Sequence, residues 1–306
     1  MLETSSTPAE RRRALRAALG SGTLLRFPGA YDALSALAIA DAGFEGVYLS
    51  GAVVAAGLGL PDIGLTTATE VARRAAEIGR VTELPMLVDA DTGFGEPMNV
   101  ARAIQLLEDA GAAGCHLEDQ VMPKRCGHLA GKSVVAIDEM VRRIGAARAG
   151  RRDPGFVLCA RTDARAVEGL PAALERARIY AGAGADMIFA EAVGSLAEIE
   201  QFRRAITVPL LINMTEFGTS PLLSAAELAD AGVNVVIYPV TLLRLAMGAV
   251  ESGLRHLAAG GTQAELVPAM QTRARLYELV DYAGYRSVDE QIFDFPVPEA
   301  GAPDER

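Results

Sequence analysis

Apolar runs of strand length alternate with stretches of helical periodicity along most of this 306-residue chain. The runs are four or five residues long and mostly apolar, whereas the stretches between them repeat apolar residues every three to four positions. Short apolar runs separated by helices are typical of a buried parallel sheet. The eight predicted strands are Leu24–Phe27, Gly46–Leu49, Pro85–Val88, Gly114–Leu117, Phe156–Ala160, Asp186–Ala190, Val208–Ile212 and Asn234–Tyr238.

Helices are predicted between these strands and after the last one. Eight strands and eight helices predict a (β/α)8 barrel of the TIM type, with an open doubly wound sheet as the alternative. No Gly-x-Gly-x-x-Gly follows the first strand, which counts against a dinucleotide-binding version of the alternative. The predicted helices are Ala33–Ala42, Thr67–Val81, Met98–Ala110, Ile137–Ala149, Pro171–Gly182, Leu196–Ile206, Ser224–Ala231 and Thr241–Leu257.

The chain extends beyond these eight units at both ends. A surface helix is predicted from Ala14 to Leu19, and a further amphipathic helix, Leu266–Val280, follows the eighth unit. Because a helix outside a closed barrel needs a surface to cover, we expect the second one to pack on a neighbouring subunit. The expected boundaries are 1–306 for a single barrel domain, 259–295 for a C-terminal helical extension, and 1–8 and 296–306 for disordered ends.

The composition restricts the class of protein. Half of the residues are hydrophobic and the net charge is −10, which argues against nucleic acid as a partner. No apolar run approaches the length of a membrane span, and no apolar core of a secretory signal follows Arg11–Arg13. Three cysteines at irregular spacing form no disulfide framework. We therefore expect a cytoplasmic protein that does not contact membranes.

Carboxylates follow three successive predicted strands, at the end where a barrel carries its site. Asp89 and Asp91 end the third strand, and positions two apart on a strand share a face. Two carboxylates so close together need a cation or a retained proton, and their hard oxygens favour Mg²⁺, with Mn²⁺ as a possible replacement. Asp62 and Glu118, after the neighbouring strands, could complete the metal's surroundings through water.

The pentapeptide Lys124–His128 places two cations, a thiol, a glycine and an imidazole after the fourth strand. This composition predicts a loop rather than a helix face or a buried strand, and the plain alternative to a site is a solvated basic loop. The cations around Cys126 are expected to favour its thiolate. A zinc site from Cys115, His116, Cys126 and His128 is a weaker alternative, because the last two are too close for the usual ligand spacing.

Cations after several strands could bind the carboxylates of a small anionic substrate, since arginine pairs with a carboxylate in two-point fashion. Asp163 and Glu191 could orient Arg161. Arg273 would reach a site only if its helix does, and on its own it is a surface residue. The expected cations are Lys124, Arg125, Arg161, Arg244 and Arg273.

Eight short stretches carry a resemblance to known proteins. They are Tyr48–Gly51, Gly59–Asp62, Leu87–Gly95, His116–Gln120, Lys124–His128, Ala160–Asp163, Asn213–Gly218 and Met270–Arg273. Together they resemble the isocitrate lyase and phosphoenolpyruvate mutase superfamily, and within it the methylisocitrate lyases. The resemblance runs from about Arg13 to Asp294, and one departure is Ala52-Val53, where these lyases have glycines.

This resemblance implies a barrel whose eighth helix is exchanged between subunits, usually in a tetramer. It implies Mg²⁺ on Asp89 and Asp91, with Asp62 and Glu118 near it, and a loop around Cys126 that closes over the substrate. With the loop residues, the expected substrate contacts are Ser50, Gly51, Ala52, Lys124, Arg125, Gly127, His128, Arg161, Glu191, Asn213, Thr215, Arg244 and Arg273.

The implied activity is a retro-aldol cleavage of 2-methylisocitrate, a tricarboxylate of the methylcitrate cycle of propionate catabolism, to pyruvate and succinate. Cys126 would protonate the carbanion, and Tyr48, which shares a strand face with Ser50, is the candidate base. Alternatives within the superfamily are isocitrate lyase, 2,3-dimethylmalate lyase, oxaloacetate decarboxylase and phosphonopyruvate-type mutases or hydrolases. An alternative of another class is a non-catalytic barrel that senses a dicarboxylate, against which Asp89, Asp91 and Cys126 argue.

Overall fold

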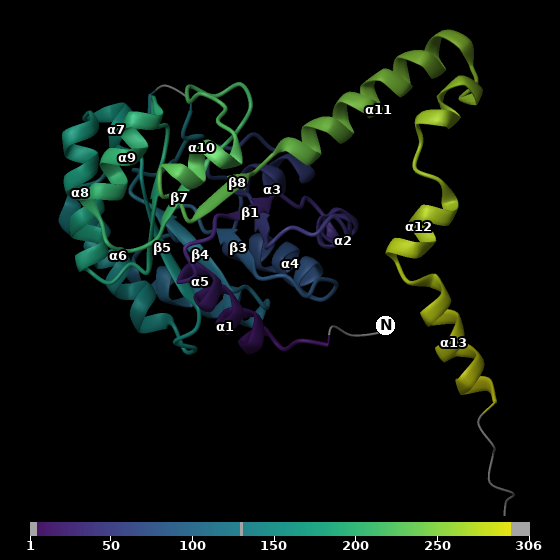
Figure 1. Cartoon of the computed structure of the whole chain (residues 1–306), viewed down its shortest axis with the longest axis horizontal. Coiled ribbons are helices and arrows are strands. Elements are labelled where there is room, and N and C mark those ends of the chain that lie inside the picture. Colours follow the sequence, from purple (N-terminus) through teal and green to yellow (C-terminus); the bar gives the residue numbers. More distant parts are fainter. Residues whose placement is uncertain (1–4, 129–130, 295–306) are drawn as a thin grey trace, which may run out of the picture.

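The computed structural model describes residues 5–128 and 131–294 and shows a barrel of parallel strands surrounded by helices, with a helical arm beside it (Figure 1). The strand order is β1-β8-β7-β6-β5-β4-β3-β2, and every strand pair is parallel. Beyond β1, Gly29 pairs with Tyr48 of β2, and the Ala30 N–H donates to the Tyr48 carbonyl at 2.9 Å. These contacts close the ring, so the predicted (β/α)8 barrel is confirmed and the open sheet is excluded.

All eight predicted strands are present, each within two residues of its expected bounds. Their apolar side chains form two buried layers, one inside the barrel and a larger one between the strands and the surrounding helices. This two-sided burial explains why the strands lack a polar face. The strands are β1 (Leu25–Pro28), β2 (Val47–Leu49), β3 (Met86–Asp89), β4 (Gly114–Glu118), β5 (Val157–Thr162), β6 (Met187–Ala190), β7 (Leu210–Asn213) and β8 (Val235–Tyr238).

The helices around the barrel also follow the prediction, with two additions. The short helices α3 (Gly51–Gly57) and α7 (Ala164–Val167) begin directly after β2 and β5, where the sequence analysis predicted loops. Ser50 caps α3, since its hydroxyl accepts the Ala52 N–H at 3.2 Å. The other helices are α2 (Ala33–Asp41), α4 (Ala68–Gly79), α5 (Pro97–Asp109), α6 (Ile137–Gly150), α8 (Leu170–Gly182), α9 (Leu196–Ala205) and α10 (Ala225–Asp230).

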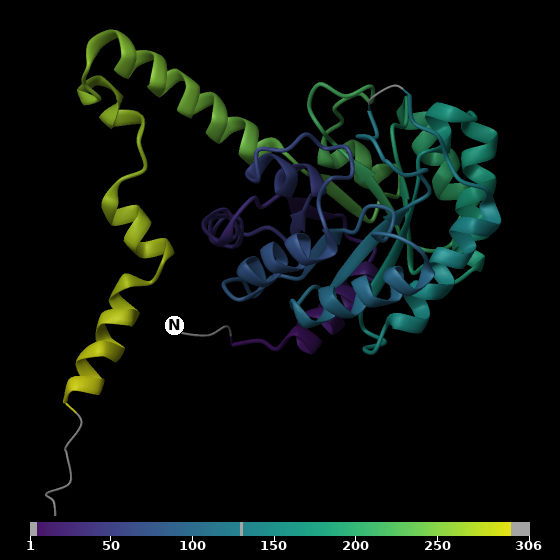
Figure 2. The same cartoon turned by 180° about the vertical axis from the view of Figure 1, so that it is seen from behind.

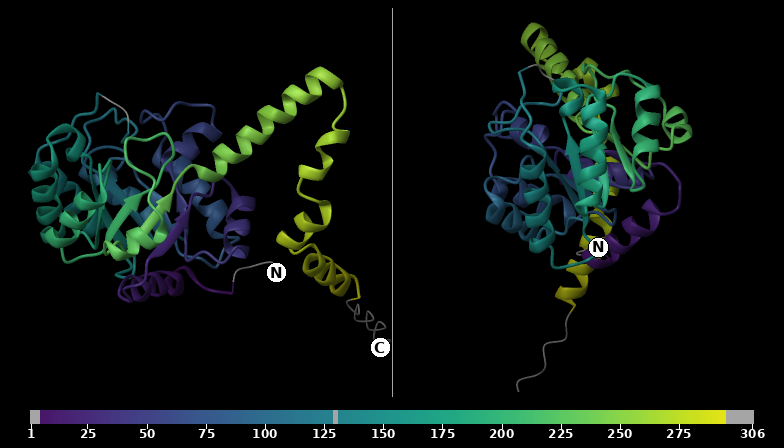
Figure 3. Two further views of the ribbon diagram at one scale, coloured as in Figure 1. Left: turned by 45° about the horizontal axis from the view of Figure 1, so that its top comes forward. Right: turned by 90° about the vertical axis from the view of Figure 1, so that its left-hand side faces the viewer.

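The N-terminal helix α1 (Pro8–Leu19) is longer than predicted, and one face of it is buried. Leu15 and Leu19 are buried and join the layer inside the barrel, and Arg12 donates to the Ala112 carbonyl at 2.9 Å. The helix therefore covers one end of the barrel, which leaves the other end for a site (Figure 3). Order begins before this helix, because the Ser6 N–H donates to Glu83 at 2.9 Å, while residues 1–4 and 295–306 lie outside the described residues.

The C-terminal arm consists of α11 (Thr241–Gly260), a 3₁₀ turn (Ala264–Ala269), α12 (Arg273–Leu279) and α13 (Tyr282–Phe293). The helix α11 starts at the end of β8 but runs away from the barrel, and none of its residues is buried (Figures 1 and 2). The prediction of one helix over Leu266–Val280 is wrong, because Pro268 lies in the 3₁₀ turn and cannot continue a helical ladder. Across 5–128 and 131–294, no helix is both long and apolar enough to cross a bilayer.

Candidate active site

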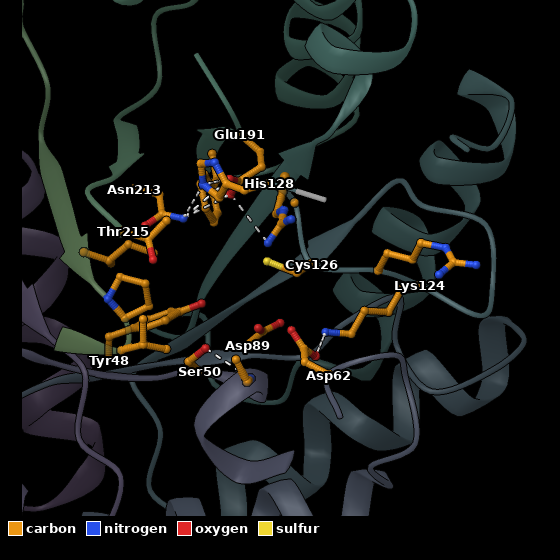
Figure 4. A pocket seen from close by; sticks show the side chains of 18 of the residues that line it. Tyr48, Ser50, Asp62, Asp89, Lys124, Cys126, His128, Glu191, Asn213 and Thr215 are labelled. Atoms are coloured by element: carbon orange, nitrogen blue, oxygen red, sulfur yellow. Dashed lines mark hydrogen bonds and ion pairs between the residues drawn. The ribbon is translucent and has the colours of Figure 1, made fainter. Parts of the chain in front are cut away.

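A cavity of about 90 Å³ lies at the C-terminal ends of the strands (Figure 4). Pockets for drug-sized ligands measure about 300–1,000 Å³, so this cavity suits a small molecule. It gathers residues predicted from several different strand ends, as expected for a barrel. The predicted residues that line it are Tyr48, Ser50, Ala52, Asp62, Asp89, Lys124, Arg125, Cys126, Gly127, His128, Arg161, Glu191, Asn213, Thr215 and Arg244.

Four other predicted residues do not line this cavity. Gly51, Asp91 and Glu118 lie just behind its wall. The Gly51 N–H donates to Asp89 at 3.0 Å. Asp91 pairs with Lys124 and Glu118 with Arg161, and both of these cations line the cavity. Gly51 must be small, because a Cβ there would lie 3.1–3.2 Å from carboxylate oxygens of Asp89 and Asp91. Arg273 begins α12 and is exposed, so one chain alone does not bring it to the site.

The strand register brings the charged residues together. Asp89 lies opposite His116 of β4, and Glu118 lies opposite Arg161 of β5. The sequence analysis expected Asp89 and Asp91 to share one face of a strand. Asp91 instead lies beyond the strand and has a left-handed backbone with φ of 46°. A turn, rather than the pleat of a strand, places its carboxylate beside that of Asp89.

The two aspartates have opposite ionisation tendencies. Burial disfavours the Asp89 carboxylate, but His116, Lys124 and Arg161 outweigh it and lower the pKa of Asp89 to about 2. Burial and the neighbouring Asp89 raise the pKa of Asp91 to about 6. Two buried carboxylates in contact thus make ionisation of the second unfavourable, which is the situation that a bound cation relieves.

The carboxylates of Asp89 and Asp91 are the type of ligand that a hard divalent ion prefers. A cation of the protein, Lys124, already contacts Asp91. Glu118 is buried near Asp89 and Asp91, and its Oε1 has no hydrogen-bond partner. This oxygen is therefore available to accept a hydrogen bond from a metal-bound water. Within the part of the chain that the structure describes, no three His, Cys, Asp or Glu side chains converge on one point. The four predicted zinc ligands are not gathered, since Cys115 packs in the layer outside the strands.

Lys124 is the cation that contacts Asp62 and Asp91. Its Nζ lies 2.5 Å from Asp62 Oδ1 and 2.7 Å from Asp91 Oδ1, and its side chain is only 4% exposed. Burial disfavours the ammonium, but Asp91, Asp89 and Glu118 outweigh this effect and raise the pKa of Lys124 above its usual value. The ammonium is therefore a fixed positive charge at the edge of the cavity.

Two buried residues that the sequence analysis did not assign to the site hold the Lys124–His128 loop. The side-chain amide of Gln120 pairs with the backbone of Arg125 at 2.8 and 2.9 Å. Lys132 donates to the Gly127 carbonyl and to Asp163 Oδ1, the latter at 2.7 Å. Gln120 belongs to one of the motifs that carry the family resemblance, but the sequence does not show that its partner lies five residues ahead.

Arg161 is the central cation of the site. Asp163 accepts two hydrogen bonds from its guanidinium, at 2.9 and 3.1 Å, and Glu118 and Glu191 lie 3.4 and 3.6 Å away. Asp163 and Glu191, the two residues expected to orient Arg161, thus both contact its guanidinium. The guanidinium also lies 5.1 Å from the centre of the Phe189 ring, so its position is fixed on several sides.

His128 joins two loops across the cavity. Its ring Nε2 lies 2.7 Å from Glu191, and its Nδ1 accepts the N–H of Thr219 at 3.1 Å. Because Nδ1 accepts a backbone N–H, the proton of a neutral ring is on Nε2, facing Glu191. His128 thus connects the loop after β4 to the loop after β7.

The expectation that the neighbours of Cys126 favour a thiolate is wrong. Burial raises the pKa of the Cys126 thiol above its ordinary value, and this effect outweighs the opposing effect of Arg161. Glu191 and Asp62 add negative charge nearby and act in the same direction as burial. In this conformation the thiol keeps its proton at neutral pH.

Tyr48 is buried beneath the cavity and its hydroxyl lies 2.7 Å from His116 Nε2. Burial and the charge of Asp89 raise the pKa of Tyr48 well above its usual value. Burial also lowers the pKa of His116 to about 4, so the pair is neutral near pH 7. The geometry gives the Tyr48 hydroxyl one side-chain hydrogen-bond partner, the ring of His116.

Four apolar residues line the cavity that sequence reasoning did not assign to it: Phe189, Ile237, Pro239 and Val240. Phe189 stands two residues before Glu191 and Ile237 two before Pro239, so strand periodicity could have indicated them. The departure from the family pattern at Ala52-Val53 has little effect here. Ala52 contributes only a methyl group to the lining, and Val53 is buried in the core.

Comparison with known proteins agrees with this fold. The family model described as phosphoenolpyruvate phosphomutase matches residues 15–258, and the chain belongs to this family of barrel enzymes. Within it, the chain is 62% identical over 295 residues to a probable 2-methylisocitrate lyase of Corynebacterium glutamicum, covering 96% of each protein. The resemblance stated from the motifs is therefore confirmed.

Two solved structures of similar fold were obtained in complex with small acids. Oxaloacetate acetylhydrolase in complex with the inhibitor 3,3-difluorooxalacetate has a TM-score of 0.89 and 35% identity, covering 94% of this chain and 99% of that one. Phosphonopyruvate hydrolase in complex with oxalate and Mg²⁺ has a TM-score of 0.84 and 30% identity, covering 94% of this chain and all of that one.

Proposed function

We propose that this protein is a Mg²⁺-dependent carbon–carbon lyase that cleaves 2-methylisocitrate to pyruvate and succinate. One observation carries the proposal: a protonated thiol, Cys126, shares a small cavity with the buried Arg161 and with the carboxylate of Asp89. A proton donor, a carboxylate-binding cation and a hard-metal ligand are the groups that such a cleavage requires. The 62% identity to a probable 2-methylisocitrate lyase supports this substrate.

The carboxylates of the cavity wall would hold the metal. Asp89 and Asp91 would bind Mg²⁺, with Asp62 and Glu118 contributing through water, and the ion would stabilise the developing alkoxide of the 2-hydroxyl group. Mn²⁺ has the same ligand preference and could replace it. The raised pKa of Asp91 supports this proposal, because a divalent cation beside the pair would favour its ionised form.

The remaining polar groups would bind the substrate. Arg161 and Arg244 would pair with its carboxylates, while Asn213 and Thr215 offer hydrogen bonds from the β7 side of the cavity. Lys124 and three other residues of its loop would cover the ligand; these are Arg125, Gly127 and His128. Other elements contribute Ser50, Ala52 and Glu191 to the wall of the cavity.

Two residues would move protons. When the hydroxyl proton leaves, the carbon–carbon bond breaks, the oxygen-bearing carbon becomes the keto carbon of pyruvate, and the electron pair stays on the other carbon. Cys126 would donate its proton to that carbon and yield succinate. Tyr48 is the candidate base, and it could accept the hydroxyl proton only by passing its own to His116, 2.7 Å away.

A turnover screen tests the proposal. The protein with Mg²⁺ is offered 2-methylisocitrate, isocitrate, 2,3-dimethylmalate and oxaloacetate, and the release of 2-oxo acid is followed for each. We expect the largest kcat/KM for 2-methylisocitrate, and complete loss of turnover on chelation or in Asp89→Ala. A larger kcat/KM for another acid would move the protein to that branch of the family.

We also propose that α11 is exchanged between subunits of a homotetramer. Met247, Val250, Leu254 and Leu257 follow one another at spacings of three and four, so they form one apolar stripe, and all four are exposed. A mainly apolar groove of about 440 Å³ lies between α2, α10 and β8, where the eighth helix of a barrel would pack. The α11 stripe of a second copy would cover this groove and bring Arg273 towards a partner's site.

A further inference from the structure

The ammonium of Lys124 occupies the space between two of the carboxylates expected to surround the metal. Its Nζ contacts Asp62 Oδ1 at 2.5 Å and Asp91 Oδ1 at 2.7 Å, and both lysine and Asp91 are about 96% buried at the side chain. Among the described residues, neither carboxylate makes an ion pair with another cation, whereas Asp89 is held by the N–H groups of Gly51 and Asp91. Lys124 is therefore the charge that balances this side of the site.

A divalent ion and this ammonium compete for the same oxygen. Mg²⁺ lies about 2.1 Å from its ligand oxygens, and Nζ is 2.7 Å from Asp91 Oδ1. Both cations on one oxygen would be only a few ångströms apart in a buried place, where repulsion between like charges is weakly screened. A bound metal would also satisfy the carboxylates that now keep Lys124 charged and buried.

We propose that Lys124 is an internal counter-ion of the metal site: it neutralises Asp62 and Asp91 in the metal-free protein, and metal binding releases its ammonium into the cavity. The inference rests on the metal part of the proposed function. It adds that metal loading creates an anion-binding group, because Lys124 lines the cavity and loses its carboxylate partners. Metal and anionic substrate would then strengthen each other's binding, as linkage requires.

Mn²⁺ binding without substrate tests the competition directly, with free Mn²⁺ measured by electron paramagnetic resonance. We expect Lys124→Met to bind Mn²⁺ at least about tenfold more tightly than the unchanged protein. The control is Arg142→Met, which removes a cation outside the site whose ion pair with Asp138 is exposed. Its Mn²⁺ affinity should stay within about twofold. Lys124→Gln repeats the test if the methionine variant does not fold by circular dichroism.

A chemical rescue tests whether an ammonium group between Asp62 and Asp91 weakens Mn²⁺ binding by its position rather than by its charge alone. In Lys124→Ala, methylammonium should re-enter the vacated space and weaken Mn²⁺ binding, whereas tetramethylammonium at the same ionic strength is too large and should not. Succinate should strengthen Mn²⁺ binding to the unchanged protein more than to Lys124→Met. Unchanged or weaker Mn²⁺ binding in Lys124→Met, or equal effects of the two ammonium ions, would overturn the inference. Because no turnover is measured, a wrong substrate assignment would leave the Mn²⁺ result intact.

Discussion

The side-chain amide of Gln120 is bonded to both polar groups of the Arg125 backbone. Its Oε1 accepts the Arg125 N–H at 2.9 Å, and its Nε2 donates to the Arg125 carbonyl at 2.8 Å. Gln120 is fully buried at the end of β4 and does not line the cavity. It therefore fixes the position of the loop that carries Lys124 and Cys126 without contacting the space where a ligand would lie.

Gln120→Glu should loosen this loop with little change in volume. A carboxylate still accepts the Arg125 N–H but cannot donate to its carbonyl, so two buried oxygens would face each other. An unmade hydrogen bond of this kind costs about 1–3 kcal/mol, and we expect turnover to fall at least about tenfold. Alkylation of Cys126 should become faster than in the unchanged protein. The control Gln105→Glu, on the exposed side of α5, should change neither rate.

The ion pairs of Asp163 predict how stability depends on pH. Burial opposes its ionisation, but Arg161 and Lys132 outweigh it and lower the pKa of Asp163 to about 2. A carboxyl whose pKa is lower in the folded protein stabilises it above the unfolded pKa of about 3.9, and this stabilisation is lost as the pH falls through about 2.

Urea denaturation between pH 2 and pH 6 checks this prediction. Asp163→Asn should lower the free energy of unfolding at pH 6 by at least about 2 kcal/mol, and the difference from the unchanged protein should shrink towards pH 2. Asp138→Asn is the control, because its pair with Arg142 is exposed and should contribute little. Parallel curves for Asp163→Asn and the unchanged protein would show that folding does not shift the pKa of this carboxyl.

The sequence was sufficient to predict the barrel because every strand is buried on two sides and a stretch of helical periodicity follows each strand. It also predicted which residues share a site, since the ends of parallel strands meet at one face. It did not predict the turn at Asp91, because a left-handed backbone at an aspartate has no marker comparable to glycine. The clamp of Gln120 on Arg125 was missed for a similar reason, because a buried amide in a motif does not reveal its partner.

The ionisation of Cys126 was predicted with the wrong sign. The neighbouring Lys124 turns to Asp62 and Asp91, and the ring of His128 turns to Glu191. Burial is the largest influence on the thiol and raises its pKa, against the opposing effects of a backbone hydrogen bond at His128 and of the Arg161 charge. The sequence shows which charged residues are neighbours along the chain. The direction of a pKa shift depends instead on burial and on the contacts that the fold makes.

The apolar stripe of α11 predicts a defined assembly. Leu254→Glu places a charge in the middle of the stripe, so we expect smaller assemblies in sedimentation velocity and reduced turnover, because Arg273 would no longer reach a partner. Arg255→Gln is the control on the same helix, since its weak pair with Glu251 is exposed. A monomer with normal turnover, in either the variant or the unchanged protein, would contradict the exchange of α11.

Alkylation reports the state of Cys126, because Cys115 and Cys159 are buried. The raised pKa of the Cys126 thiol leaves little thiolate at neutral pH, so iodoacetamide should react more slowly with it than with a free thiol. The rate should rise as the pH increases above neutrality. Succinate with Mg²⁺ should slow it further if the ligand covers the loop.

Cys126→Ser tests whether this thiol donates the proton. The substitution changes volume little, so the loop should keep its contacts and the variant should bind succinate with nearly unchanged affinity. A serine hydroxyl is a much weaker acid than a thiol, and a positioned acid typically contributes about 10²- to 10⁴-fold to the rate. We therefore expect kcat for 2-methylisocitrate to fall by at least about a hundredfold, as measured by pyruvate release. The control Cys159→Ala removes a buried thiol of the barrel interior, and its folded fraction should retain kcat because Cys159 does not line the cavity. If Cys126→Ser kept the normal kcat, the thiol would be only a wall of the cavity, and His128, whose Nε2 faces Glu191, would be the next donor to test.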